Sequence, residues 1–151
     1  MKIILFQPQI PQNTGNIART CAATKTDLIL VRPLGFSISS RQMKRAGLDY
    51  WDLVHVETID DLEKFLESTT HPFYFFSSKA EKIYSEAKYD ENSMFIFGSE
   101  TEGLPPFFHE KYSDRFYKIP MTPNSRCLNL SSSAAVVLYE ALRQNLFFGW
   151  S

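Results

Sequence analysis

Short runs of consecutive apolar residues recur along the chain, separated by longer segments of mixed polarity. An uninterrupted apolar run of this length is typical of a strand that is buried on both faces of a sheet. We therefore expect strands at residues 3–6, 28–31, 53–56, 73–76, 94–97 and 116–119.

The segments between these runs predict helices. Apolar residues three or four positions apart indicate amphipathic helices at 13–25, 59–66 and 131–145, and a short basic helix is expected at 39–46. Asn13 and Ser131 stand where residues that cap helices are common. Because strands alternate with helices, the pattern predicts an α/β fold, with a mostly parallel sheet and helices on both faces.

Length and composition indicate one globular domain spanning residues 1–151. The chain has 44% hydrophobic and 22% charged residues and a formal net charge of -1. A domain of this size buries roughly 70% of the surface of its unfolded chain. No basic tail is present, so any binding of nucleic acid must come from a local cluster of Lys and Arg.

Cysteine and histidine positions argue against a metal site. Cys21 and Cys127 are far apart, and the three histidines show no spacing typical of metal ligands. The apolar run at the N-terminus stops at Gln7 and Pro8, which does not resemble a signal peptide. No apolar stretch reaches the roughly 18 residues of a membrane span. We therefore expect a cytoplasmic protein without metal or membrane contact.

Two polar segments follow predicted strands early and late in the chain. Residues 13–20 (NTGNIART) place Gly and polar side chains at a helix start, which suits a phosphate or another polar ligand. Residues 95–105 (FIFGSETEGLP) end a buried strand in Gly98, two acids, Gly103 and Pro105. Ligands bind beyond the carboxyl ends of strands in parallel sheets. An ordinary helix cap and a solvated acidic loop remain the alternatives.

A third segment, residues 119–133, combines Asn and Ser side chains with the apolar Leu128 and Leu130. A loop of this kind can wrap an adenine through backbone groups and apolar contact. The alternative is a plain loop whose Ser residues only cap the last helix.

In this order and spacing, the three segments resemble the signature motifs of the SpoU branch of the SPOUT methyltransferases. The stretches are NTGNIART, FIFGSETEGLP and IPMTPNSRCLNLSSSAAVVLYEAL, and the resemblance covers nearly the whole chain. The chain is similar to the short, single-domain members that methylate the 2′-oxygen of cytidine or uridine at the tRNA wobble position. The stretches FQPQIP and RAGLDYW support this subgroup.

The resemblance implies a deep C-terminal trefoil knot, a homodimer, and S-adenosylmethionine as cofactor within the knot. It places five residues in the cofactor pocket, namely Phe76, Gly98, Ile119, Cys127 and Leu128. Cys127 departs from many relatives, which have Ser there. The substrate implied is the anticodon loop of tRNA, and the chemistry needs no metal.

Arg19 matches the arginine of the first motif, which the resemblance assigns to catalysis. A guanidinium is always protonated and is a poor base. We therefore expect Arg19 to bind an RNA phosphate and to stabilise negative charge that develops on the 2′-oxygen. Glu102 is a candidate for orienting Arg19 or a nearby amide. The expected RNA-binding residues are Asn13, Arg41, Arg45, Arg126, Asn129 and Ser131.

Two other functions remain open. A catalytically idle protein with the same knot could bind RNA or assist assembly, although Arg19 and residues 98–105 are both present. A flavodoxin-like binder of small molecules would fit the α/β pattern. It would leave the third segment unexplained, and the first loop lacks a GxGxxG sequence.

Overall fold

The computed structural model describes residues 1–39, 41, 43 and 51–150, and these form one parallel sheet of seven strands. The strand order is β3-β2-β1-β6-β4-β7-β5. The strands are β1 (Lys2–Phe6), β2 (Asp27–Val31), β3 (Val56–Ile59), β4 (Phe73–Phe76), β5 (Lys82–Ile83), β6 (Met94–Phe97) and β7 (Phe116–Lys118).

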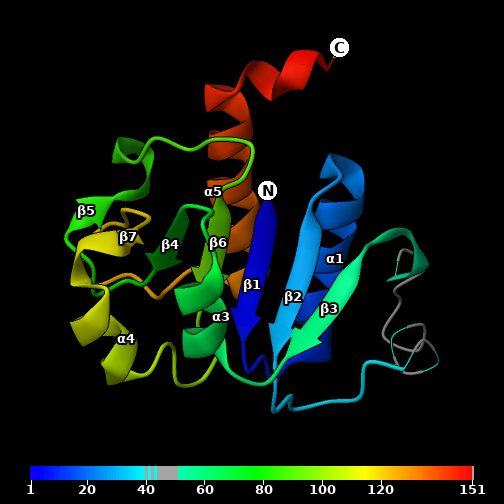
Figure 1. Cartoon of the computed structure of the whole chain (residues 1–151). Coiled ribbons are helices and arrows are strands. Elements are labelled where there is room, and N and C mark those ends of the chain that lie inside the picture. The colour runs from blue at the N-terminus through cyan, green and yellow to red at the C-terminus, as the bar shows by residue number, and fades with distance from the viewer. Residues whose placement is uncertain (40, 42, 44–50, 151) are drawn as a thin grey trace.

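Helices cover both faces of the sheet, as the sequence predicts (Figure 1). They are α1 (Pro11–Thr24), α3 (Leu62–Ser68), α4 (Pro106–Lys111) and α5 (Leu130–Gln144). Side chains alternate along β1, so Ile3 and Leu5 pack on the face of α1 and α5, whereas Ile4 packs on the face of α3 and α4. Two apolar cores therefore hold the sheet between two helical layers.

The first and last helices are not capped by the residues that we expected. Helix α1 starts at Pro11, whose fixed φ suits the first helical position. Asn13 is therefore not a cap but a buried residue inside α1. Helix α5 is capped by Asn129, whose side chain accepts a hydrogen bond from the amide of Ser131, so Ser131 is not the cap either.

The strand predicted at 53–56 is wrong. Residues Trp51–Leu53 form a 3-10 turn, and β3 begins only at Val56, where it pairs with β2. Leu53 is 73% exposed, so this apolar residue contributes little to the core. The helix expected at 59–66 begins at Leu62 instead, capped by Asp61, whose carboxylate accepts from the Lys64 amide at 3.0 Å.

The predicted helix at 39–46 lies mostly outside the described residues, and so does Arg45. The sequence analysis also missed β5 and α4, which are two and six residues long. Four short 3-10 segments complete the described structure, at Trp51–Leu53, Tyr84–Glu86, Ser113–Arg115 and Leu146–Gly149.

Both chain ends lie on the side of the molecule where the strands begin, opposite the carboxyl ends of the strands (Figure 1). The loops after β4, β6 and β7 therefore gather at the other edge, away from the termini. None of the helices in the described ranges has the length and apolar character needed to cross a membrane.

Candidate functional site

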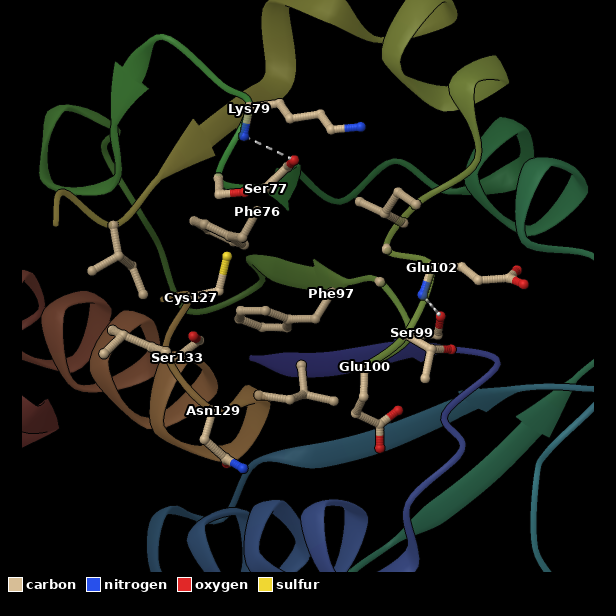
Figure 2. Close-up of a pocket in the computed structure, with 18 of the residues that line it drawn as sticks. Phe76, Ser77, Lys79, Phe97, Ser99, Glu100, Glu102, Cys127, Asn129 and Ser133 are labelled. Atoms are coloured by element: carbon tan, nitrogen blue, oxygen red, sulfur yellow. Dashed lines mark hydrogen bonds between the residues drawn. The ribbon is translucent and has the colours of Figure 1, made fainter. Parts of the chain in front are cut away.

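A cavity of about 600 Å³ opens where β4, β6 and β7 end. Three stretches of chain contribute most of its wall: residues 76–79, 97–104 and 119–133 (Figure 2). All five residues expected to hold the cofactor line it, namely Phe76, Gly98, Ile119, Cys127 and Leu128. The fold thus brings together residues that are far apart in sequence.

The cavity combines flat apolar surfaces with polar groups. The rings of Phe76 and Phe97 stack with centroids 5.1 Å apart. Ile119 and Leu128 add aliphatic surface, and Ser and Asn side chains supply hydrogen-bonding groups. A pocket of this size and mixed character is typical of sites for small organic ligands, including those with a flat ring and a polar sugar.

Gly98 is required by the loop itself. A Cβ atom on Gly98 would lie 2.3 Å from the carbonyl carbon of Gly103 and 2.5 Å from the Leu104 amide nitrogen. The two ends of this loop are joined because Ser99 and Gly103 exchange backbone hydrogen bonds of 3.2 and 3.0 Å. Gly103 has φ of 68°, the left-handed region that glycine adopts without strain.

The Glu100 carboxylate ties the second predicted segment to the first. It accepts hydrogen bonds from the amides of Gln9 and Ile10 at 2.9 and 2.8 Å, and from Asn13 Nδ2 at 3.2 Å. Sequence reasoning missed this role and favoured Glu102. The available signal was that Glu100 lies nearer to the strand end, where the loop leaves the sheet.

Asn13 and Asn129 extend this network into the third segment. Asn129 Nδ2 donates to Asn13 Oδ1 at 3.0 Å, and Asn129 Oδ1 accepts from the amide and the hydroxyl of Ser131. Asn13 is 6% exposed, whereas Asn129 is exposed at the cavity wall. The three sequence segments therefore meet in one hydrogen-bonded assembly beside the cavity.

The basic residues expected to act on RNA lie elsewhere on the described surface. Arg19, Arg41 and Arg126 are exposed, and the cavity wall as described does not include them. Arg19 is six positions after Asn13 in α1, which places it about 120° around the helix and about 9 Å along it. While Asn13 points toward the network, Arg19 points to another side.

Two basic residues that the sequence analysis did not select do line the cavity, Lys79 and His109. The His109 ring stacks on Phe116 with centroids 4.2 Å apart. Partial burial and the nearby charge of Lys79 both lower the pKa of His109. The imidazole is therefore uncharged near neutral pH.

The two cysteines have different surroundings. Cys127 is exposed and lines the cavity. Cys21 belongs to α1 and is buried in the core on that face of the sheet, and burial raises the pKa of its thiol to about 12. Among the described residues, no group of three His, Cys, Asp or Glu is placed to hold a metal ion.

Comparisons with known proteins agree with this geometry. The model of the SpoU rRNA Methylase family matches residues 1–139. A protein of Geobacillus stearothermophilus, provisionally named a tRNA (cytidine(34)-2′-O)-methyltransferase, is 48% identical over 100% of this chain and 99% of its own length. A Methylovorus glucosotrophus protein with that enzyme name is 44% identical, with 97% of each chain covered.

A solved structure shares the fold along nearly the whole chain. It has a TM-score of 0.85 and 43% sequence identity, and the match covers 97% of this chain and 96% of that one. Its description concerns the methylation of the 2′-hydroxyl of C/U34 on tRNA.

Proposed function

Since this chain belongs to the SpoU rRNA methylase family, we propose that it methylates the ribose 2′-hydroxyl of the tRNA wobble nucleotide, a cytidine or uridine at position 34. One observation carries the proposal: the three segments that resemble the family's motifs meet at one cavity, joined by the Glu100–Asn13–Asn129 network. The relatives named for this reaction match over nearly their whole length.

The cavity fits S-adenosylmethionine, which supplies a methyl group bound to a positively charged sulfur. Phe76, Phe97, Ile119 and Leu128 offer apolar surface to an adenine. The backbone at Gly98 and the polar side chains beside it offer partners to a ribose. The volume of about 600 Å³ lies within the range of sites for ligands of this size.

Arg19 would act on the RNA. Its guanidinium cannot serve as a base, but it can bind a phosphate and stabilise negative charge on the 2′-oxygen as the proton leaves. Asn129 lines the cavity and Ser131 is hydrogen-bonded to it, so both would contact the nucleotide, while Arg41 and Arg126 would bind the RNA backbone. Holding the 2′-oxygen in line with the donor can supply several kcal/mol of the barrier.

The position of Arg19 favours a homodimer as the active form. Arg19 does not line the cavity of its own subunit, so a second copy would have to bring its arginine to that cavity. Apolar side chains are available for such an interface: Val136 and Tyr139 on α5 are 37% and 46% exposed. Large exposed apolar patches commonly mark interfaces.

The knot is part of the same proposal. Helix α4 packs on one face of the sheet, and α5, which follows β7, packs on the other, so the chain crosses the sheet between them. We infer that the segment after β7 threads the loop formed after β6, making a trefoil knot, an exception to the rule that chains do not knot. A crystal structure traced from 94 to 144 tests the threading.

As tRNA is the substrate, we place the protein in the cytoplasm. The proposed activity is tested in cells by deleting the gene and measuring the 2′-O-methylated nucleosides at position 34 by mass spectrometry. Loss of the methyl group and its return with the wild-type gene support the proposal. An unchanged modification, or rescue by an Arg19→Ala variant, would favour an RNA-binding role without catalysis.

A further inference from the structure

One wall of the cavity carries Lys79, a residue that the three motif-like segments do not include. Lys79 follows β4 in a turn held by Ser77, whose carbonyl accepts from the Ala80 amide at 3.1 Å and whose hydroxyl accepts from the Lys79 amide at 3.2 Å. The Ser77 amide donates to the carbonyl of Tyr117 in β7 at 3.0 Å. The backbone of Lys79 is thereby anchored to the sheet.

Lys79 adds a positive charge to the cavity wall. In the described part of the chain, Lys79 forms no ion pair with a carboxylate. Within the described residues no other Lys or Arg lines the cavity. Carboxylates pair instead with Lys2, Arg32, Lys111 and Arg143. His109 lines the cavity with Lys79, but its lowered pKa leaves it neutral near pH 7.

The opposite side of the cavity is negative. Figure 2 shows Lys79 on one side and Glu100 on the other. The Glu100 carboxylate is fixed there by the amides of Gln9 and Ile10. A ligand is therefore favoured when its anionic group lies toward Lys79 and disfavoured when that group lies toward Glu100.

We propose that the Lys79 ammonium binds the carboxylate of the amino-acid part of S-adenosylmethionine. The inference rests on the proposed function, which makes that molecule the ligand. Its adenine is uncharged and its sulfur and amine are positive, so the carboxylate is its anionic group. Lys79 lines the same cavity as the five predicted cofactor residues, whereas Arg19 and Arg126 lie outside it, so the cofactor is favoured over an RNA phosphate.

Calorimetry with two ligands isolates this contact. S-adenosylhomocysteine keeps the carboxylate, and 5′-methylthioadenosine lacks the whole amino-acid part. We expect Lys79→Met to raise the Kd for S-adenosylhomocysteine about tenfold, a typical loss for one charge-assisted hydrogen bond. The Kd for 5′-methylthioadenosine should change less than about twofold. Lys79→Arg should retain most of the affinity.

Lys64→Met is the matched control, because it removes the same charge from an exposed lysine on α3 that does not line the cavity. It should leave both affinities unchanged. The inference is overturned if Lys79→Met lowers the affinity for both ligands equally, or lowers neither affinity. A change confined to the KM for tRNA, which would assign Lys79 to RNA, also overturns it. If the wild-type protein binds neither ligand, the proposed function fails as well.

Discussion

Among single residues, Arg19 is the one we expect to act in methyl transfer and not in cofactor binding. It is exposed on α1 and does not line the cavity. We predict that Arg19→Ala lowers kcat by about a hundredfold or more, the usual loss when one group that stabilises a developing oxyanion is removed. The Kd for S-adenosylhomocysteine should change less than about threefold. Steady-state kinetics and calorimetry measure the two effects, and parallel losses in both would make Arg19 structural.

The two cysteines give a chemical test of the cavity. At pH 8, a thiol with a pKa of about 12 is ionised in roughly one molecule in ten thousand, and only the thiolate reacts readily. We predict that iodoacetamide labels the exposed Cys127 and spares the buried Cys21 in the folded protein. S-adenosylhomocysteine should slow the labelling of Cys127. Peptide mass spectrometry follows both sites, and labelling of Cys127 at the same rate with saturating ligand would place the ligand elsewhere.

The residues of the site were predictable from sequence to different extents. The five expected cofactor residues do line one cavity, because each ends or follows a strand of the same parallel sheet or lies in the loop before α5. Glu100 and Lys79 were missed. The hydrogen bonds of Glu100 and the place of Lys79 in the cavity wall depend on segments distant in sequence, and spacing along the chain carries no information about such contacts.

At the scale of secondary-structure elements, long periodic or fully apolar segments were predicted well. Residues 73–76 and 94–97 form strands with the expected bounds, because each is buried on both faces. The strand expected at 53–56 was wrong because an apolar pair, Leu53 and Val54, lies in and beside a 3-10 turn. The short elements β5 and α4 form through tertiary contacts: within the described residues β5 pairs only with β7, and Phe108 of α4 packs in a core cluster.

The loop after β6 should be the most sensitive element of the site. Gly98→Ala would put a Cβ atom 2.3 Å from the backbone of Gly103. We predict a loss of about 1–3 kcal/mol in the free energy of unfolding, since both sides of the contact are backbone and must shift. Urea unfolding followed by circular dichroism measures it.

Gly103 provides the comparison, because a Cβ atom there meets nothing within 4 Å and only its φ of 68° is unfavourable. Gly103→Ala should lower the free energy of unfolding, and Gly103→Asn should lower it less, because Asn tolerates left-handed backbone. Gly98→Asn should be no better than Gly98→Ala. Recovery by Asn at position 98 would contradict the steric explanation.

At the scale of the whole molecule, the protein should be a homodimer, active only in that form. Apolar side chains on α5 and in the tail remain exposed, including Tyr139 at 46% and Phe148 at 47%. We predict that it sediments at micromolar concentration with twice the subunit mass of 17.4 kDa. Tyr139→Glu should weaken the dimer and the methylation rate together, because burying an unpaired carboxylate is costly. A monomer with full activity would contradict the prediction.

Methyl transfer to the ribose of nucleotide 34 can be measured with two tRNA substrates. Purified protein is incubated with S-adenosylmethionine and either native tRNA or the same tRNA carrying a single 2′-deoxynucleotide at position 34. We predict one methyl group on the ribose of nucleotide 34 in the native tRNA, located by mass spectrometry of nuclease fragments, and no transfer to the 2′-deoxy substrate. Methylation of the 2′-deoxy tRNA at an undiminished rate, or a methyl group on any other nucleotide, would contradict this prediction.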